Sequence, residues 1–518
     1  MMRFLSANRR LSIGIRRPLI LHPIFFAIYP PLFLYSINLW QTEIDVLWNP
    51  LTLVLYATLL IWYLLQRIFG RRLLVGLLTS LTLFMFFAYG HVHGALLNRE
   101  IVIGYHRYLL PLWLLLFGVG LVLIFRSRTH WKSMTLILNL VSSLFVLQAS
   151  VGFARWVYTR NQSISLQLGR VPEVVLSSVG NIPDIYYIIL DGYMRSDYLE
   201  KELDYDNGQF LTFLKDRDFY VAEKSHSNYP YTAFSLASSL NMRYINYLSQ
   251  AMGEDSKDFT VTYPFIQTSE AARLLKTLGY RYVQVGTLWS VTNYSKIANQ
   301  MVSYLSVSDA DQFFNLFLRT TLAAFLFESR GGEERATVLY AFDQIPRLGD
   351  DGGPTFVFAH IVSPHPPYVF DAEGGKVETP EEGWDSAGTK HAYLDQVKHV
   401  NLKVMELVDK LLASDKPPVI ILQSDHGWAW AIGWDLYPYV PVDERFDYEQ
   451  VFGILNAYYL PGKGTESLYP TISPVNTFRQ IFDLYFNAGL RLLPDESFYS
   501  DYYKSPYRFQ NVTPSLSM

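Results

Sequence analysis

The stretch that decides the fold is Val419-Ile420-Ile421-Leu422-Gln423-Ser424-Asp425-His426-Gly427. It is a short apolar run that follows two prolines and ends in an acid, an imidazole and a glycine. Such a run predicts a buried parallel strand that stops abruptly and presents Asp425 and His426 at its carboxyl end. In open α/β sheets, ligands bind in the crevice beyond the carboxyl ends of the strands. We therefore expect a binding site here if other strands end in similar chemistry.

Two other apolar runs end in side chains of the same kind. The run from 184 to 190, rich in aromatic and β-branched residues, predicts a strand that ends in Asp191-Gly192. The run from 355 to 362 predicts a strand that contains His360 and leads into His365. The remaining pattern predicts helices near 207–217, 269–278, 310–347, 391–414 and 475–487, and strands near 219–222 and 280–285. This alternation indicates an α/β domain with a mainly parallel central sheet covered by helices.

Composition narrows the class of protein. Of the 518 residues, 50% are hydrophobic and only 17% are charged, which is apolar for a soluble enzyme. A net charge of -4 without a long basic tract argues against a general nucleic-acid binder. The chain has no cysteine. This absence excludes disulfides, thiolate zinc sites, a cysteine nucleophile and a formylglycine made from cysteine.

The apolar excess is concentrated in the amino-terminal part of the chain. A bilayer span needs about 20 apolar residues, and five runs reach or approach this length: 18–40, 47–66, 73–96, 108–125 and 134–153. Basic residues cluster before the first run and after the second and fourth, so the positive-inside rule places the amino terminus in the cytoplasm. We expect a transmembrane domain of five helices at 1–155, a linker near the membrane surface at 156–182, and an extracytoplasmic catalytic domain at 183–518.

A polar, proline-bearing loop turns into a predicted helix at or near Thr232. A hydroxyl at a helix amino terminus lies where backbone N–H groups and the helix dipole favour an anion. Carboxylate and imidazole together suit Zn2+ or Mn2+, and a metal that contacts the hydroxyl makes it a nucleophile. Each part alone has a simpler explanation, such as a helix cap at Thr232 or a turn at Asp191-Gly192. Their joint occurrence at strand ends favours attack on a phosphate or sulfate ester.

Taken in order, these motifs resemble a known family. Asp191-Gly192 ends a first strand, Thr232 follows at a helix start, and a His365-Pro366-Pro367-Tyr368 loop precedes Ser424-Asp425-His426-Gly427. This arrangement resembles the alkaline phosphatase/sulfatase superfamily. The preceding membrane spans make the chain most similar to the membrane-bound branch, which includes lipoteichoic acid synthase and the lipid A phosphoethanolamine transferases.

The resemblance implies a metal site and a nucleophile. Asp191, Asp425 and His426 would bind one divalent metal, Zn2+ or Mn2+, and Thr232 would bind it too while acting as the nucleophile. Membrane-bound members commonly have glutamate where this chain has Asp191, but either residue supplies a carboxylate. Formylglycine sulfatases need Cys or Ser in a C/S-x-P-x-R context, and Thr232 cannot be oxidised to formylglycine. The resemblance therefore disfavours ordinary sulfatase activity.

The same resemblance places two more histidines near the substrate. His365 stands where the family has a histidine that binds substrate phosphate or transfers a proton, and His360 is a second substrate-binding candidate. A second metal would need further ligands, typically with an Asp-x-x-x-His spacing. Asp395 and His399 have this spacing, but they fall inside the predicted 391–414 helix. We interpret them as an exposed i, i+4 pair.

Taken with the membrane spans, the resemblance implies a metal-dependent transferase of the cell inner or plasma membrane. The enzyme would move a phosphoryl-linked head group, phosphoglycerol or phosphoethanolamine, from a membrane phospholipid to an envelope glycan or lipid. A covalent phosphothreonine would be the intermediate. Two alternatives stay open: a sulfatase-like hydrolase of phosphate or sulfate esters that uses the same site, and a non-enzymatic membrane protein with a degenerate site.

Overall fold

The structure is a computed structural model of the chain. It describes residues 18–97, 99, 101–163, 182–286, 289–304, 312–326, 332–349, 352–377, 387–428, 447–502 and 504–516. Their contacts form two units. A helical unit comprises the described residues of Met1–Leu39, Ile44–Tyr158 and Phe313–Glu328, and an α/β unit comprises the others.

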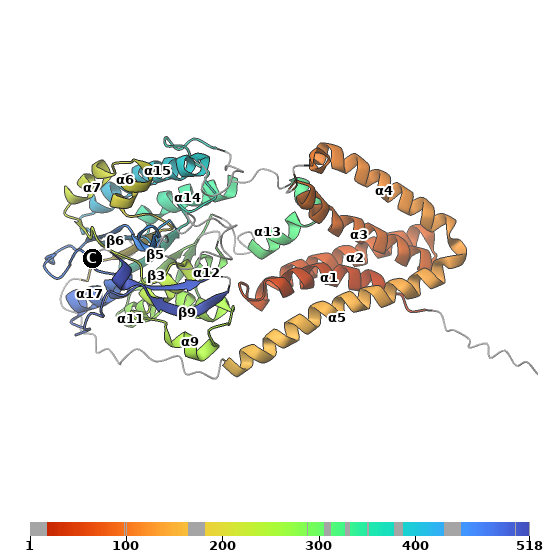
Figure 1. Ribbon diagram of the computed structural model, residues 1–518, viewed down its shortest axis with the longest axis horizontal. Helices are drawn as coiled ribbons and strands as arrows, with labels where there is room; N and C mark the ends of the chain where they lie inside the picture. The colour runs from red at the N-terminus through yellow and green to blue at the C-terminus, as the bar shows by residue number, and fades with distance from the viewer. Residues whose placement is uncertain are drawn as a thin grey trace, which may run out of the picture. The chain divides into compact units, whose positions relative to one another are not determined.

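The helical unit contains all five predicted apolar runs as helices (Figure 1): α1 His22–Ile37, α2 Trp48–Phe69, α3 Arg72–Leu97, α4 His106–Arg126 and α5 Trp131–Ser163. Short 3-10 turns accompany them: η1 Ile44–Leu47, η2 Val102–Gly104 and η3 Arg128–His130. Four helical segments, which include α2 to α5, are long and apolar enough to cross a membrane. α1 has 16 residues, or about 24 Å at 1.5 Å per residue. Because this is shorter than a bilayer core of about 30 Å, five spans stay a prediction.

The α/β unit is built on a seven-stranded sheet in the order β2-β7-β6-β1-β5-β3-β4. The strands are β1 Ile185–Leu190, β2 Tyr220–Val221, β3 Arg281–Val285, β4 Gln300–Val302, β5 Thr355–Ile361, β6 Val419–Gln423 and β7 Asn456–Tyr459. All neighbours from β6 to β4 pair in parallel, whereas β7 pairs antiparallel with β6 and with β2. The predicted parallel α/β sheet is therefore confirmed. A separate hairpin joins β8 Phe498–Asp501 to β9 Ser505–Asn511.

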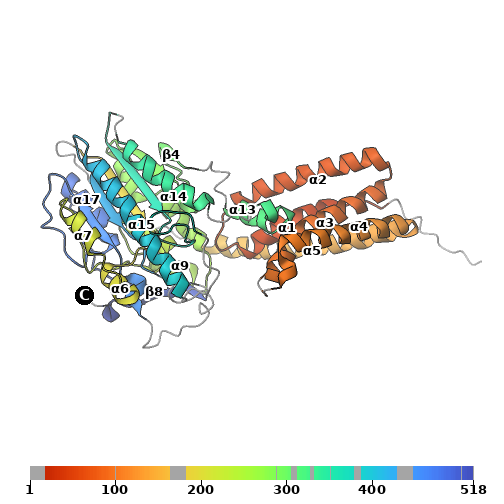
Figure 2. The ribbon, with the colours of Figure 1, turned by 90° about the horizontal axis from the view of Figure 1, so that it is seen from above.

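Helices cover both faces of this sheet (Figures 1 and 2). On one face lie α6 Ser196–Leu203, α7 Gly208–Lys215, α14 Gly332–Gln344 and α15 Ala387–Leu412; on the other lie α8 Thr232–Ser239, α11 Glu270–Thr277 and α17 Pro474–Phe486. β1 explains the two layers, because alternate side chains of a strand point to opposite faces. Tyr187 and Ile189 enter one core cluster, while Tyr186 and Ile188 enter the other. A strand buried on both faces needs the continuous apolar run that its sequence shows.

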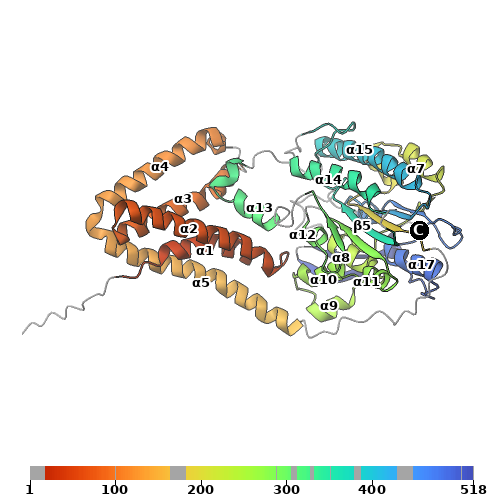
Figure 3. The same cartoon turned by 180° about the vertical axis from the view of Figure 1, so that it is seen from behind.

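Smaller elements complete the unit: α9 Tyr247–Met252, α10 Tyr263–Gln267, α12 Ser290–Asn293, α16 Tyr448–Phe452, η4 Phe259–Thr262, η6 Ile345–Arg347 and η8 Thr513–Ser515. The predicted 310–347 helix is instead α13 Gln312–Arg319, the turn η5 Leu322–Leu326 and α14. α13 and η5 pack in the helical unit, as the rear view shows (Figure 3). The predicted linker begins as helix, because α5 continues to Ser163; residues 164–181 lie outside the described residues.

Candidate metal centre

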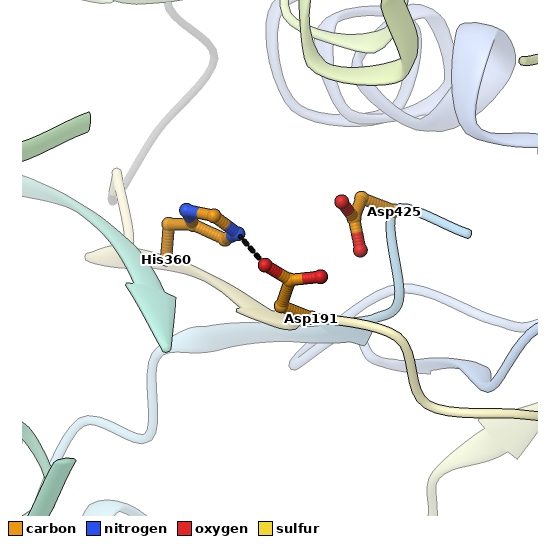
Figure 4. A group of neighbouring side chains, drawn as sticks. All are labelled: Asp191, His360 and Asp425. Carbon is orange, nitrogen blue, oxygen red and sulfur yellow. Dashed lines mark ion pairs between the residues drawn. The ribbon is translucent and has the colours of Figure 1, made fainter. Parts of the chain in front are cut away.

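The order of the strands brings the predicted ligands together. β1 lies between β5 and β6 and is parallel to both. Ile189 pairs with His360 on one side and with Gln423 on the other, so the three carboxyl ends meet at one edge. Asp191 follows β1, and Asp425 follows β6 by two residues. The side chains of His360 and Asp425 converge on Asp191 from the two neighbouring strands (Figure 4).

Five side chains gather at this edge. Potential ligand atoms of Asp191, His360 and Asp425 all lie within 4.8 Å of one another, and all three residues are buried. His360 Nε2 is 3.2 Å from Asp191 Oδ2. His426 Nε2 is 3.6 Å from Asp191 Oδ1 and 3.5 Å from Asp425 Oδ2. Thr232 Oγ1 lies 3.3 Å from the same His426 nitrogen. The structure thus brings together the four residues of the predicted metal set and adds His360, which we had expected on the substrate.

Hydrogen bonds on the far side of each ring orient the two central histidines. His426 Nδ1 lies 2.7 Å from Gly427 O, a carbonyl that can only accept, so Nδ1 carries the proton. His360 Nδ1 lies 3.0 Å from Thr292 Oγ1, a hydroxyl that is also 3.5 Å from Trp289 O and donates to it. In both arrangements Nε2 is the ring nitrogen that faces the carboxylates. Metal-binding histidines show this pattern, in which the second ring nitrogen is held by a carbonyl or another polar group.

The side chains fit a divalent cation. Within the described part of the chain, Asp191 Oδ1 and Asp425 Oδ2 are buried oxygens without a hydrogen-bond partner. A buried, unsatisfied carboxylate oxygen is costly unless a cation or donor meets it. Two carboxylates with two imidazoles form a mixed oxygen and nitrogen set, which suits Zn2+ or Mn2+. The arrangement is therefore a candidate metal centre, and it does not identify the ion.

Electrostatics at the centre favour the charged forms. Burial by itself would raise the pKa of Asp191, but the imidazoles of His365, His360 and His426 outweigh burial and lower the pKa well below its usual range. Burial would likewise lower the pKa of His426, yet the carboxylates of Asp425 and Asp191 raise it. A carboxylate that stays ionised in a buried site, as that of Asp191 does, is the acceptor that a cation requires.

Thr232 lies where the sequence predicted it, at the start of a helix. α8 begins at Thr232, and Tyr231 O accepts the N–H groups of Phe234 and Ser235. The N–H groups of Thr232 and Ala233 come before these two, at the start of the helix, where N–H groups have no carbonyl partner within the helix and, with the helix dipole, favour an anion. The half-buried hydroxyl therefore lies beside both the carboxylate cluster and an anion-binding helix end.

His365 lies next to the centre without joining the cluster. Its backbone N–H donates to Asp191 O at 2.9 Å, which ties the loop after β5 to the end of β1. Its Nδ1 lies 2.5 Å from Pro366 O. The side chain is half-buried, and a Cβ atom at Gly192, the residue after Asp191, would lie 3.8 Å from His365 Cα.

The loop around Asp425 and His426 is held by a close backbone contact. Gly427 N donates to Val451 O at 2.7 Å. A Cβ atom at Gly427 would lie 2.3 Å from Gln450 O and 2.8 Å from Gly453 O. Because these are backbone atoms of α16 and its end, no side chain fits there. The glycine of the Ser-Asp-His-Gly motif is thus required by packing, and α16 fixes the position of His426.

A buried charged cluster supports this arrangement, and the sequence analysis missed it. Glu449 Oε2 of α16 accepts from Arg195 Nη2 at 2.9 Å and lies 2.7 Å from His226 Nε2. Arg195 follows Asp191 in the chain and also pairs with Asp197. Backbone hydrogen bonds also join these segments to the end of α16: Arg195 N donates to Gly453 O, and Ser227 N donates to Phe452 O. No local pattern reveals this cluster, because Glu449 is 223 residues from His226.

The prediction that Asp395 and His399 form an exposed pair was wrong in two respects. His399 is buried, with 3% of its surface exposed, and its ring stacks on Phe370 with centroids 4.4 Å apart. Asp395 instead pairs with His391 and Lys398. The helix turns His399 toward Phe370 and Gly374 in the loop after β5, whereas the spacing alone had indicated a solvent-exposed pair.

Residues 183–439 match the family model described as Sulfatase. This domain is therefore a sulfatase-family domain of the alkaline phosphatase superfamily, and the protein is an enzyme of that class. The superfamily resemblance seen in the sequence is confirmed for this part of the chain. No curated protein matches the sequence significantly.

Several solved structures are similar to this chain at low sequence identity. The C-terminal periplasmic domain of EcEptC from Escherichia coli is 13% identical, with a TM-score of 0.41, over 68% of this chain and 98% of that one. The integral membrane lipooligosaccharide phosphoethanolamine transferase A from Neisseria meningitidis is 13% identical, with a TM-score of 0.34, over 85% and 88%. A phosphonate monoester hydrolase of Agrobacterium radiobacter is 10% identical, with a TM-score of 0.40, over 61% and 80%.

Proposed function

We propose that the protein transfers a phosphoryl-linked head group from a phospholipid at the outer face of the cell inner or plasma membrane. The observation that carries the proposal is the approach of the Thr232 hydroxyl to buried ligands in a chain that also has membrane-spanning helices. Basic residues after α2 and α4 support an amino terminus in the cytoplasm. A donor in the membrane explains why the catalytic domain is attached to such helices, whereas a soluble ester would not require them.

In the proposed reaction, Thr232 Oγ1 forms a bond to the phosphorus of the head group while the bond from phosphorus to the diacylglycerol oxygen breaks. The hydroxyl proton passes to a base, and the departing diacylglycerol oxygen takes up a proton. N–H groups of the first turn of α8 bind the phosphoryl oxygens. An acceptor hydroxyl of an envelope glycan or lipid then attacks the phosphothreonine and releases Thr232.

Asp191, Asp425, His426 and His360 are the residues that would hold a divalent metal. When bound, this metal would lower the pKa of the threonine hydroxyl and neutralise charge on the phosphoryl group. We assign His360 to the ligands because its Nε2 points at Asp191 Oδ2. His365 is the group that would move the proton: its Nδ1 is engaged by Pro366 O, so Nε2 would exchange the proton with the oxygen of the leaving group or acceptor.

The test uses the full-length protein, zinc or manganese, and head-group-labelled phospholipids in vesicles. Mass spectrometry of the Thr232 peptide should show an adduct whose mass names the head group. Thr232→Ala should show neither adduct nor head-group release, whereas Thr232→Ser should keep part of both. Ready release by Thr232→Ala would contradict the nucleophile assignment. Turnover of nitrophenyl phosphate without any lipid adduct would favour the soluble-ester hydrolase.

A further inference from the structure

The segment of α13 and η5, residues 313–326, is unusual for part of a catalytic domain. It lies within the stretch that matches the sulfatase family, yet it packs with the apolar helices. Its sequence, Phe-Phe-Asn-Leu-Phe-Leu-Arg-Thr-Thr-Leu-Ala-Ala-Phe-Leu, contains no acidic residue and one basic residue. We call it the inserted segment.

One face of the inserted segment belongs to the core of the helical unit. Phe313 and Phe317, one turn apart, are 3% and 1% exposed. The Phe313 ring contacts Tyr35 near the end of α1 at a centroid distance of 6.1 Å, and the Phe317 ring contacts Phe87 of α3 at 5.9 Å. These four aromatic rings belong to one buried core cluster of the helical unit.

The turn between α13 and η5 lies directly against α3. A Cβ atom at Gly90 would lie 2.4 Å from Arg319 O and 2.4 Å from the Thr320 carbonyl carbon. Small residues allow this close backbone approach between helices in membranes. The turn also satisfies its own polar groups: the Thr320 hydroxyl donates to Phe317 O at 2.7 Å, and the Thr321 hydroxyl donates to Leu318 O at 2.7 Å. Internal hydrogen bonds are what a non-helical turn needs at membrane depth.

The contact with α3 indicates how deep in the membrane the inserted segment lies. Gly90 is 18 residues after Arg72, the first residue of α3, which corresponds to about 27 Å. Arg71 and Arg72 lie at the start of α3, and we call this end of the helical unit the basic end. The hydrocarbon core of a membrane is about 30 Å thick. Arg319 therefore lies at the opposite boundary of the core, where lipid phosphates are found.

The other face of the segment is apolar and open. Leu316, Phe325 and Leu326 are 43%, 41% and 68% exposed. The membrane helices also carry exposed apolar side chains, such as Leu140 of α5 at 63%. Arg319 is the one basic residue of the segment, and it is half-buried. A guanidinium beside apolar side chains matches the phosphate and the acyl chains of one lipid.

We propose that the inserted segment binds a phospholipid of the leaflet opposite the basic end, with Arg319 on the lipid phosphate and Leu316, Phe325 and Leu326 on the acyl chains. The proposal rests on the membrane placement of the helices and is independent of the reaction at Thr232. The catalytic domain is then attached to the membrane through the lipid contact of the inserted segment, in addition to the covalent connection through α5.

Because the chain has no cysteine, single-cysteine variants test the apolar contacts directly. Leu316→Cys, Phe325→Cys and Leu326→Cys would be labelled with a fluorophore in full-length protein in phosphatidylcholine nanodiscs. Leu140→Cys is the lipid control, and Leu402→Cys, 45% exposed on α15, is the water control. We expect quenching by lipids with a doxyl group near the head group, and weaker quenching when it is near the chain end. Labels that respond to aqueous iodide like the Leu402 label would overturn the proposal.

The phosphate contact has a second test, which does not use turnover. Native mass spectrometry would count lipids that remain bound to full-length protein after detergent exchange. Arg319→Gln should reduce the occupancy by about tenfold, the loss expected for a charge-assisted hydrogen bond, and Arg319→Lys should keep part of it. Equal occupancy in Arg319→Gln and the parent protein would refute the assignment. Neither test depends on the phosphothreonine, so a failure here and a failure of the proposed reaction are distinguishable.

Discussion

Replacing Glu449 with glutamine tests whether the buried charged cluster sets the geometry of the metal centre. Glu449 and Arg195 are 7% and 5% exposed at their side chains, and their closest atoms are 2.9 Å apart. Breaking a buried ion pair costs about 3–5 kcal/mol. Glutamine keeps the shape and one acceptor, and Arg195 retains Asp197. We therefore expect Glu449→Gln to destabilise the α/β unit by about 2–4 kcal/mol.

Asp197→Asn is the matched control, because it removes the other carboxylate that pairs with Arg195. The Asp197 side chain is 56% exposed, and exposed pairs contribute about 0–1 kcal/mol. Thermal unfolding of the full-length protein in detergent measures both variants. At about 2 °C per kcal/mol for a large domain, Glu449→Gln should lower the midpoint by about 4–8 °C and Asp197→Asn by about 2 °C or less.

The same variant should weaken metal binding, although Glu449 touches no ligand. α16 accepts the Gly427 N–H through Val451 O, so a displaced α16 moves His426. Loss of an outer-shell support typically lowers metal affinity by about 10–100-fold. Competition with a zinc-binding dye would measure the change. Equal unfolding midpoints for Glu449→Gln and Asp197→Asn, or an unchanged zinc affinity in Glu449→Gln, would refute the reasoning.

Three further predictions follow from the α/β unit. Asp191→Asn should abolish metal binding, because it removes the shared carboxylate; elemental analysis that finds the same metal content as in the parent would contradict the site. Gly427→Ala should cost about 1–3 kcal/mol of stability, because its Cβ meets the backbone of Gln450 at 2.3 Å; an unchanged unfolding midpoint would argue against that contact. Burial on Phe370, then the charges of nearby basic side chains, lower the pKa of His399 to about 4. The unfolded chain then binds the proton more readily, so stability is complete above about pH 6.5 and falls by up to about 3 kcal/mol as the pH drops toward 4. His399→Leu should flatten this part of the pH–stability curve, and a parallel curve would disprove the assignment.

The sequence predicted most of the α/β domain because its strands are continuous apolar runs that end in polar residues. β1, β5 and β6 fall within a residue or two of their predicted ranges. Their order in the sheet was not predicted, because pairing between residues 171 or more positions apart leaves no local pattern. β7 was missed for a related reason: it is short and pairs antiparallel at the end of a parallel sheet.

In the site, too, the residues with a local sequence signal were predicted and the long-range contacts were not. Asp191, Thr232, Asp425 and His426 carry motif signals, and the structure brings their side chains together. His360 was predicted as a second substrate-binding residue, and the register beside Ile189 places it next to Asp191 instead. The inserted segment was predicted as helix, but its partners are helices more than two hundred residues earlier. A pattern of local hydrophobicity cannot name such a partner.

The central position of β1 has a consequence for how the protein acquires its metal. Because β1 is hydrogen-bonded on both edges and buried on both faces, its amides should exchange with solvent only when the whole domain opens. The ligands that follow β1, β5 and β6 come together only after the middle of the sheet is complete. A metal that binds this native arrangement and not the unfolded chain stabilises the fold by mass action. The hydrogen-exchange rate of the β1 amides would then measure metal occupancy, although the β1 amides do not bind the metal.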